Sequence, residues 1–383
     1  MSSLFQIQRI IKQWIVRYKE NSKRQRLLKF LSLQKKISMI FVTGGTGLIG
    51  SHLLYKLVSE GKKVRALKRT SSNTRQVFKT ISYYTENPEE LFNRIDWVTG
   101  DVLDYFEMEN LIAGVDEVYH CAAIVSFNSA DRRKLIRTNV EGTANIVNAS
   151  LENRVKKFCH VSSVSALGAS QNGLPADEHT NWVPSKKVNA YSESKFFSEA
   201  EVWRGIQEGL DAIIVNPSIV LGPGKWDSGS PTIFKTVWDG LQFYTKGTIG
   251  YVDVKDVVKV MFMLMTDENF KKFKNQRFLL SSENWSYQKL LNCIADFLQK
   301  SRPKWAVSGL MLGIAWKAAI IFNLVAKRRF PITRETAVAA NAHKIYDGSK
   351  IINSIGFNYL PILDSVKQTA EILIKDMQNM KTY

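Results

Sequence analysis

Three tyrosines in this sequence stand four residues before a lysine, a spacing that can support acid–base chemistry at a carbonyl group. The pairs are Tyr191/Lys195, Tyr251/Lys255 and Tyr346/Lys350. A phenol has a pKa of about 10, so the pKa must be lowered before the group can exchange a proton near neutral pH. On a helix, a lysine four residues later supplies a positive charge on the same face. The spacing alone does not choose among the pairs.

The surroundings of Tyr191 favour the first pair. It lies in residues 188–206, whose pattern is typical of a helix, 28 residues after Ser163. Ser163 follows an expected strand at 157–161, and catalytic groups of open α/β sheets gather at the carboxyl ends of strands. The other two pairs are expected to be structural, because one lies in an extended segment and the other has the helix-breaking Gly348 between its two members.

A glycine-rich loop, TGGTGLIG at 43–50, stands between an expected strand and an expected helix. Such a loop allows a tight turn, close approach of a pyrophosphate to the backbone, and binding of the anion at the helix N-terminus. The sequence therefore predicts a dinucleotide site here. Its expected contact residues are Gly44, Thr46, Gly47, Leu48, Ile49 and Gly50.

The end of the next expected strand bears on the choice between NAD and NADP. It reads VRALKR at 64–69 and contains no acid that could hold a ribose 2′-hydroxyl. Arg69, together with Arg65 or Lys68, could bind a 2′-phosphate instead. The alternative is a solvated basic strand end. We expect NADP(H), with NAD(H) left open.

From residue 39 onward, short apolar runs rich in β-branched residues alternate with longer helix-like segments, as in βαβ units. The expected strands are 39–43, 63–67, 95–98, 117–121, 157–161 and 212–215. After Pro217, glycines and prolines crowd together and no regular strand alternation follows. We expect an α/β fold. Its predicted parts are a doubly wound parallel sheet (Rossmann domain) at 39–221 and a smaller, mainly substrate-binding region at 222–383, with segments at about 250–282 returning to the Rossmann domain.

The formal net charge of +18 is unevenly distributed. Residues 1–38 hold ten Lys and Arg against one acid, Glu20, and so carry half of the excess. We expect this segment to be a basic leader outside the fold or a helix on a membrane surface. The remainder is moderately basic, which suits a phosphate-bearing ligand and does not argue for nucleic-acid binding.

A second segment, 305–326, is nearly as long as the roughly 20 apolar residues that span a bilayer. Lys317 lies in its middle, so the sequence favours a core or substrate-lid helix and leaves a membrane-facing helix open. The three widely spaced cysteines predict no disulfide framework and a reducing compartment, and the five scattered histidines predict no metal site. We expect a cytoplasmic protein, peripheral to a membrane if either segment contacts one.

Further short motifs occur in a fixed order along the chain. They are Asp101-Val102, His120-Cys121-Ala122-Ala123, Asn139-Val140-Glu141-Gly142-Thr143, Val161-Ser162-Ser163, Asn216-Pro217-Ser218 and Tyr251-Val252-Asp253-Val254. With these motifs, the chain from Met39 to about Ala370 resembles the extended short-chain dehydrogenase/reductases, which include sugar-nucleotide epimerases, dihydroflavonol reductases and 3β-hydroxysteroid dehydrogenases. Arg69 matches the phosphate-binding arginine of the dihydroflavonol-reductase-like branch.

The resemblance implies a role for each matching residue. Ser163 would hydrogen-bond the substrate oxygen, Tyr191 would exchange its proton, and Lys195 would hold the nicotinamide ribose and lower the pKa of Tyr191. The implied cofactor contacts are Asp101, Val102, Cys121, Ala122, Ala123, Asn139, Tyr191, Lys195, Pro217 and Ser218. The chain departs from the family pattern at Asn216, where arginine is frequent.

These expectations combine into an NADP(H)-dependent oxidoreductase acting on a ketone, an aldehyde or the corresponding alcohol. The apolar C-terminal segment favours a hydrophobic small-molecule substrate. Two alternatives stay open: a sugar-nucleotide epimerase or dehydratase with bound NAD, and a non-catalytic NADP-binding assembly or regulatory protein. A homodimer is also left open.

Overall fold

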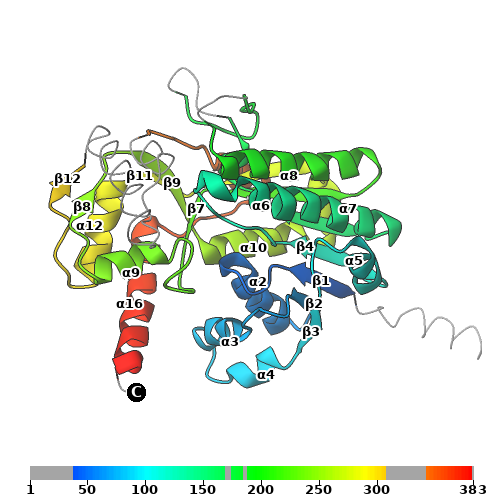
Figure 1. The fold of residues 1–383 in the computed structure, drawn as a ribbon, viewed down its shortest axis with the longest axis horizontal. Helices are drawn as coiled ribbons and strands as arrows, with labels where there is room; N and C mark the ends of the chain where they lie inside the picture. Colours follow the sequence, from blue (N-terminus) through cyan, green and yellow to red (C-terminus); the bar gives the residue numbers. More distant parts are fainter. Residues whose placement is uncertain (1–37, 169–173, 184–187, 308–341, 382–383) are drawn as a thin grey trace, which may run out of the picture. The chain divides into compact units, whose positions relative to one another are not determined.

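The computed structural model describes residues 38–168, 174–183, 188–307 and 342–381, and residues Met39–Tyr383 form one compact unit (Figure 1). Its central sheet has seven strands, all parallel, in the order β10-β6-β5-β4-β1-β2-β3. The strands are β1 (Met39–Thr43), β2 (Lys63–Lys68), β3 (Ile95–Thr99), β4 (Glu117–His120), β5 (Lys157–Val161), β6 (Ala212–Pro217) and β10 (Gln276–Leu280). The predicted α/β fold with a parallel sheet is confirmed.

The direction of winding reverses between β1 and β4, which are neighbours in the sheet although β2 and β3 separate them in sequence. In open parallel sheets, ligands bind at the carboxyl ends of the strands beside such a reversal. Both β1 and β4 end directly before candidate site residues, since Gly44 follows Thr43 and Cys121 follows His120. The topology therefore brings the loops that follow these two strands together.

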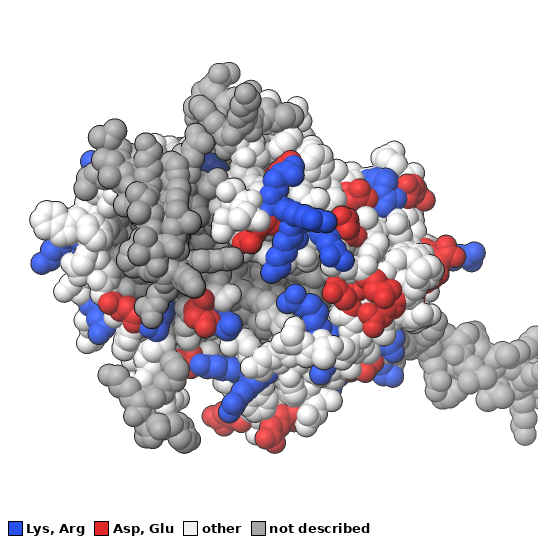
Figure 2. All heavy atoms as spheres, viewed as in Figure 1, with Lys and Arg blue, Asp and Glu red and all other residues white. Residues whose placement is uncertain are grey.

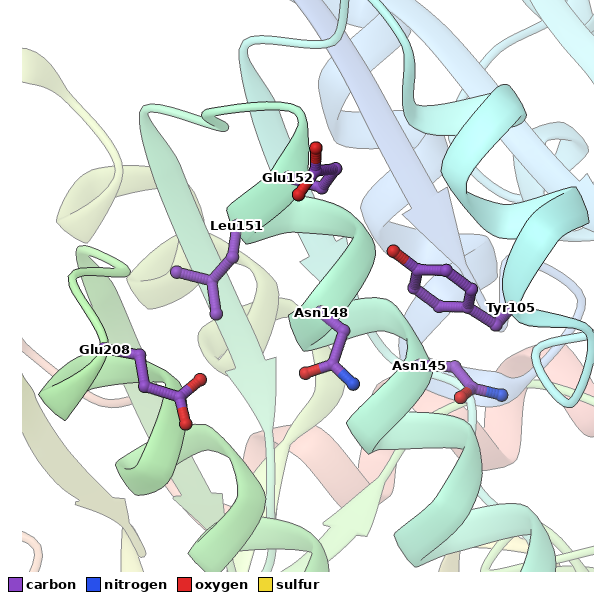
Figure 3. A pocket seen from close by; sticks show the side chains of 6 residues that line it. All are labelled: Tyr105, Asn145, Asn148, Leu151, Glu152 and Glu208. Carbon is purple, nitrogen blue, oxygen red and sulfur yellow. The ribbon is translucent and has the colours of Figure 1, made fainter.

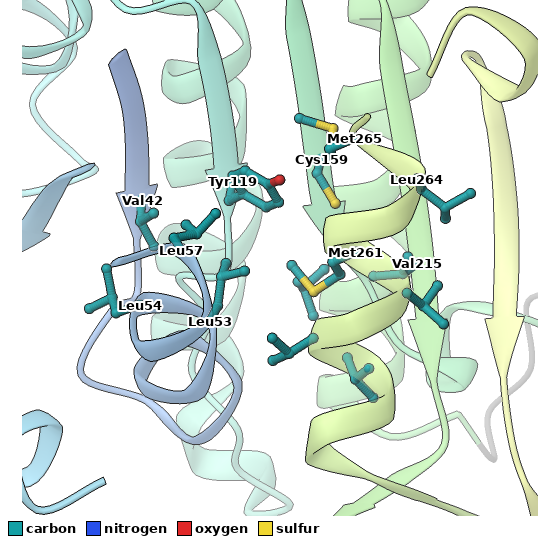
Figure 4. Packing of buried hydrophobic residues seen from close by; sticks show 14 of the residues in the cluster. Val42, Leu53, Leu54, Leu57, Tyr119, Cys159, Val215, Met261, Leu264 and Met265 are labelled. Carbon is teal, nitrogen blue, oxygen red and sulfur yellow. The ribbon is translucent and has the colours of Figure 1, made fainter. Parts of the chain in front are cut away.

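Helices cover both faces of the sheet because alternate strand residues point in opposite directions. On β1, Ile40 and Val42 pack toward α2 (Leu48–Ser59) and α10 (Val254–Leu264), whereas Phe41 packs toward the opposite layer. Figure 4 shows the first of these layers, where side chains of β1, β4, β5 and β6 meet those of the two helices. The opposite layer contains α5 (Tyr105–Ile112), α7 (Gly142–Glu152) and α8 (Ala190–Gln207).

Shorter helices complete the Rossmann part. They are α3 (Arg75–Ser82), α4 (Pro88–Phe92), the 3₁₀ turns η1 (Ser129–Asp131) and η3 (Val164–Ala166), α6 (Arg132–Leu135), the π-helical turn η2 (Ile136–Glu141), α11 (Asp267–Phe273) and α15 (Ser349–Ile355). The π-turn joins α6 to α7 without a break. Such turns often occur at functional sites, and this one carries Asn139.

The region after Pro217 contains more strands than the sequence suggested, so that expectation was wrong. A three-stranded sheet has the order β11-β9-β7, and two further strands pair separately. These strands are β7 (Ile219–Leu221), β9 (Thr248–Asp253), β11 (Glu283–Ser286), β8 (Phe243–Tyr244) and β12 (Trp305–Ala306). They have two to six residues each. Alternation of apolar and polar residues is hard to recognise over so few positions.

A separate core fills this C-terminal region. It lies among α9 (Thr232–Trp238), α12 (Tyr287–Phe297) and α16 (Ile362–Lys381). On α16, Ile362, Val366 and Ala370 are fully buried, and they recur every four residues on one helix face. Strand β10 nevertheless joins the main sheet beside β6, with Phe278 opposite Val215. A strand from the C-terminal region of the chain thus belongs to the sheet of the Rossmann part.

Two predicted segments lie largely outside the described residues: the basic leader 1–38 and the apolar stretch 305–326. Where the stretch begins, Trp305 is exposed on β12. Among the helices that the structure describes, none combines the length and the apolar character that crossing a bilayer requires.

Candidate active site

The glycine loop forms a tight connection between β1 and α2. Gly44 has a left-handed backbone (φ +68°), and its carbonyl accepts a hydrogen bond from Gly47 N at 3.0 Å. A Cβ on Gly44 would lie 2.5 Å from the backbone of Cys121, which follows β4, and a Cβ on Gly50 would overlap the Gly44 carbonyl. Glycine is therefore required at both positions by conformation or by close backbone contact.

The third glycine has a different environment. Gly47 is exposed, has an ordinary extended backbone, and caps α2 without a side-chain hydrogen bond. A Cβ at this position would meet only the Gly44 carbonyl, at 3.3 Å. The first N–H groups of α2 and the open space at Gly47 suit a pyrophosphate. Thr46, Leu48 and Ile49 are half-buried within the same turn, and their contact with a cofactor stays a prediction.

The loop after β4 is tied to the end of β1. Thr43 Oγ1 hydrogen-bonds His120 Nδ1 at 2.7 Å and accepts from Ala122 N at 3.2 Å. Burial lowers the pKa of His120 to about 3, so its ring is neutral and serves as a structural link. Cys121 and Ala122 are half-buried and Ala123 is exposed, all beside the glycine loop.

Asn139 reaches the same loop from the π-turn and supports it. Its amide oxygen accepts from Ile124 N at 2.7 Å, and its amide nitrogen donates to Ile124 O and to Ser194 Oγ, both at 3.0 Å. The side chain is fully buried. Direct contact with a cofactor stays a prediction, whereas its link between the β4 loop and α8 is observed.

Asp101 and Val102 follow β3 at the same edge of the sheet. The Asp101 carboxylate is exposed and accepts a hydrogen bond from Leu103 N at 3.0 Å. Val102 is buried, and its side chain lies against the α-carbon of Gly142. Asp101 is thus placed where a ligand could reach it, but an adenine contact stays a prediction for both residues.

Ser163, Tyr191 and Lys195 come together beside these loops. Asn189 caps α8 by accepting from Ser192 N at 2.8 Å, so the helix begins just before Tyr191. The Ser163 side chain lies beside the Tyr191 phenol and acts on its pKa, and Lys195 Nζ donates to Val161 O, the last residue of β5, at 3.0 Å. The chosen pair and Ser163 therefore form one cluster.

Electrostatics at this cluster differ from the expectation in one respect. Burial raises the pKa of Tyr191, and the hydrogen bond to Ser163 is the interaction that lowers it. The expected lowering was assigned to Lys195, whose own ammonium is engaged with Val161. Burial lowers the pKa of Lys195 to about 8, although the carboxylate of Glu199 acts in the opposite direction.

Pro217 and Ser218 lie at the end of β6, next to Ser163. Asn216 Nδ2 donates to Ser163 O at 3.1 Å, so the residue that departs from the family pattern anchors the backbone of Ser163. Ser218 is buried, and its hydroxyl makes no hydrogen bond to any residue that the structure describes. A buried hydroxyl without a partner suits a polar ligand. The residues at this edge of the sheet thus fit a nicotinamide dinucleotide.

The comparison with known sequences agrees with this geometry. The profile of the NAD dependent epimerase/dehydratase family matches residues 40–276. The chain belongs to this family. It is an NAD(P)-dependent oxidoreductase of the extended short-chain dehydrogenase/reductase type, as the resemblance predicted.

Individual relatives extend the match over most of the chain. A putative dihydroflavonol 4-reductase of Synechocystis sp. is 32% identical over 346 residues, which cover 88% of this chain and 94% of the relative. Sterol demethylase protein B of Methylococcus capsulatus is 28% identical over 76% of this chain and 83% of its own length. The crystal structure of gox2253 superposes with a TM-score of 0.72 at 27% identity and covers 88% of this chain and 98% of that chain.

The lowered pKa of Lys195 leads to a prediction of how activity depends on pH. Below pH 8 the ammonium is charged and can hold a ribose hydroxyl, and above pH 8 it loses the proton. We expect kcat/KM to fall as the pH rises through about 8. In the unfolded chain the lysine keeps its proton up to about 10.5, so deprotonation in the folded state makes this group's contribution to stability more favourable above pH 8.

The pH dependence of kcat/KM, measured together with the melting temperature, checks this prediction. If activity and melting temperature fell together between pH 8 and 9, unfolding would explain the loss. A Lys195→Met variant should have low activity and should no longer show a decrease near pH 8.

The positions expected to bind phosphate are not equivalent. Arg65 is engaged within the fold, with Nε donating to Asp96 Oδ2 at 3.0 Å and Nη1 to Leu111 O at 3.1 Å, and its role in binding a ligand phosphate stays a prediction. Lys68 is half-buried at the end of β2. Arg69 is exposed, and its backbone forms a turn with Ser72.

Positive charge also lies near the start of α8. Four basic side chains are exposed on α6 and η2, and Figure 2 shows Lys and Arg gathered over this part of the surface. They are Arg132, Arg133, Lys134 and Arg137. Arg132 makes a bidentate ion pair with Glu193, at 2.6 and 2.9 Å, two residues after Tyr191. This charge favours the approach of anionic molecules to the site.

A surface hollow elsewhere does not belong to the site. It is lined by Tyr105, Asn145, Asn148, Leu151, Glu152 and Glu208 (Figure 3). Glu208 follows Tyr191 by 17 residues, which corresponds to about 25 Å along α8 at about 1.5 Å per residue. Asn148 Oδ1 already accepts from Arg204 Nη2 at 2.7 Å. The hollow is therefore remote from the catalytic group.

Proposed function

We propose that this protein is an NADP(H)-dependent reductase of a ketone or aldehyde on a hydrophobic small molecule, or a dehydrogenase of the corresponding alcohol. The observation that carries the proposal is the juxtaposition of Ser163, at the end of β5, with Tyr191 and Lys195 on α8, whose Nζ donates to Val161 O at 3.0 Å. This group lies at the same edge of the sheet as the glycine loop. The proposed acid Tyr191, the orienting hydroxyl of Ser163 and the glycine loop proposed to bind the cofactor thus lie at the same edge of the sheet.

When bound there, NADPH supplies a hydride to the carbonyl carbon. Tyr191 gives its phenolic proton to the carbonyl oxygen, so one C–H and one O–H bond form while the carbonyl π bond is lost. Ser163 donates a hydrogen bond that holds the oxygen in line with Tyr191. Lys195 holds positive charge one turn away. In the reverse direction, Tyr191 takes the proton of a secondary alcohol.

Apolar side chains near Tyr191 support a hydrophobic substrate. The Phe127 ring lies edge-on to the Tyr191 ring, with centroids 5.6 Å apart, and is 42% exposed. Val125 in the same loop is 57% exposed. Burying both side chains against an apolar substrate would contribute roughly 25 cal/mol per Å² of apolar surface. One of the relatives reported above is named a sterol demethylase protein, and sterols are largely apolar molecules.

Arg69 is the proposed determinant of NADP over NAD. We expect Arg69→Ala to weaken NADPH binding by roughly 10- to 150-fold, since a charge-assisted hydrogen bond contributes about 1.5–3 kcal/mol. Binding of NADH should change little, because NADH has no 2′-phosphate. The dissociation constants of both cofactors, measured by fluorescence titration, check this prediction.

The matched control for Arg69 is Arg94→Ala. Arg94 is also exposed, but it pairs with Glu90 and precedes β3, at the opposite edge of the sheet. It should leave both constants unchanged. Equal weakening of NADPH and NADH by Arg69→Ala would contradict a role in phosphate selection.

The function itself is tested with purified protein and a panel of apolar ketones and aldehydes, with sugar nucleotides alongside. We expect NADPH oxidation with at least one apolar carbonyl and no interconversion of the sugar nucleotides. Epimerisation or dehydration of a sugar nucleotide, without consumption of NADPH, would favour the epimerase alternative and overturn the proposal.

A further inference from the structure

A carboxylate is buried directly behind the catalytic group. Glu199 lies on α8 four residues after Lys195, on the same helix face, and only 3% of the residue is exposed. A buried carboxylate is costly unless donors and positive charges surround it. Its surroundings therefore indicate what it does.

Four donors from different parts of the fold converge on this carboxylate. Oε2 accepts from Ser162 Oγ at 2.6 Å and from Asn216 Nδ2 at 2.7 Å. Oε1 accepts from Trp203 Nε1 at 3.2 Å and from Arg277 Nη1 at 3.1 Å. These donors lie next to the end of β5, on β6, on α8 and on β10. One side chain thus joins three adjacent strands to the catalytic helix.

Two of these donors hold Ser163 in place. Ser162 is its chain neighbour, and Asn216 Nδ2 bridges Glu199 and the Ser163 carbonyl, with the second hydrogen bond at 3.1 Å. The Ser163 side chain in turn lies beside the Tyr191 phenol and lowers its pKa. A change at Glu199 would therefore displace Ser163 relative to Tyr191 through one or two hydrogen bonds.

The charge of Glu199 also acts on Lys195. The other titratable groups that act on the lysine are neutral: burial raises the pKa of the Cys121 thiol to about 12, lowers the pKa of His120 to about 3, and lowers the pKa of His160 well below its usual range. The nearby Tyr191 phenol is also protonated at neutral pH, because its pKa is raised. Among these described groups, Glu199 supplies the negative charge opposite the ammonium.

We propose that Glu199 is a positioning residue of this active site, which holds Ser163 in register with Tyr191 and keeps Lys195 charged. Arg277 balances the charge of the carboxylate through an ion pair at 3.1 Å, and its Nε donates to Glu178 O at 2.7 Å. The inference rests on the proposed function, since it assigns a role within that reaction.

Replacing the carboxylate by an amide, Glu199→Gln, tests this role in the full-length protein with NADPH and a carbonyl substrate. We expect kcat to fall by about 10- to 100-fold, part of the roughly 10²–10⁴-fold that a positioned acid contributes. KM for the carbonyl compound should change less than about threefold, since Glu199 is buried and its four hydrogen-bond partners belong to the protein. The alkaline decrease in activity should move to lower pH by about one unit or more.

Two further variants distinguish the effect of the negative charge of Glu199 from the effect of its hydrogen bonds. Glu199→Asp keeps the charge but shortens the side chain, so kcat should fall while the alkaline decrease stays near its wild-type pH. Glu201→Gln is the matched control, because Glu201 lies on the same helix and pairs only with Arg204 among the described residues, at 2.8 Å. It should leave kcat and the pH profile unchanged.

If Glu199→Gln does not fold, as judged by circular dichroism, Ser162→Ala decides the question. It removes one donor and keeps the charge, so kcat should fall about fivefold, the equivalent of one hydrogen bond. Ser150→Ala, at an equally buried serine on α7, should have no effect on kcat. Unchanged kcat and pH profile in folded Glu199→Gln, or unchanged kcat in Ser162→Ala, would overturn the proposal. Absence of turnover in the wild-type protein would instead refute the proposed function.

Discussion

Tyr191→Phe is expected to lower kcat by roughly 10²–10⁴-fold, the contribution of a positioned general acid. The change removes only the phenolic oxygen, which lies beside Ser163, and keeps the ring beside Phe127. The free energy of unfolding should therefore change by no more than about 1 kcal/mol. Cofactor affinity should stay within about threefold of the wild-type value. Single-turnover kinetics with NADPH measure the rate of the chemical step, and fluorescence titration measures cofactor affinity.

The matched control is Tyr251→Phe, which alters another tyrosine that stands four residues before a lysine. Tyr251 is fully buried in the C-terminal core, and its hydroxyl makes no hydrogen bond to any described residue. Removing that hydroxyl should leave kcat unchanged and should not destabilise the fold. If Tyr251→Phe abolished turnover while Tyr191→Phe retained it, the assignment of the acid would be wrong.

Six of the seven parallel strands could be predicted, all except β10, because the central ones are buried on both faces and form short apolar runs. Five of the six expected strands begin and end within one residue of the observed bounds, and the sixth, β6, continues two residues further to Pro217. Runs such as Ile213–Val215 are apolar on both faces, which is the signature of a central parallel strand. The glycine loop was equally readable, since its function depends on residues that are adjacent in sequence.

Other features depend on contacts between distant residues. Arg277 reaches Glu199 across 78 positions in the chain. Similarly, Arg65 binds Asp96 because β2 and β3 are neighbours, a fact of sheet order that a basic strand end does not reveal. A local signal for Glu199 did exist, because it stands four residues after Lys195 on a helix. Phe127 had none, since 64 positions separate it from Tyr191.

Alanine substitutions at Gly47 and Gly50 should differ in their effects on cofactor binding and on folding. Gly47→Ala places a methyl group in open space, with the Gly44 carbonyl at 3.3 Å, so the melting temperature should stay near the wild-type value. The same methyl group occupies the expected approach of the pyrophosphate, and NADPH affinity should fall at least about tenfold. In Gly50→Ala the methyl group overlaps the Gly44 carbonyl, so both stability and affinity should be lost, with destabilisation of about 1–3 kcal/mol or more.

Thermal melts and NADPH titrations of both variants distinguish these outcomes. Gly205→Ala is a useful third variant, because its methyl group would overlap the Val147 side chain between α7 and α8, away from the glycine loop. It should lower the melting temperature and leave NADPH affinity intact. A Gly47→Ala protein that binds NADPH normally would show that the pyrophosphate does not approach this turn, and the cofactor would then have to lie elsewhere along the edge of the sheet.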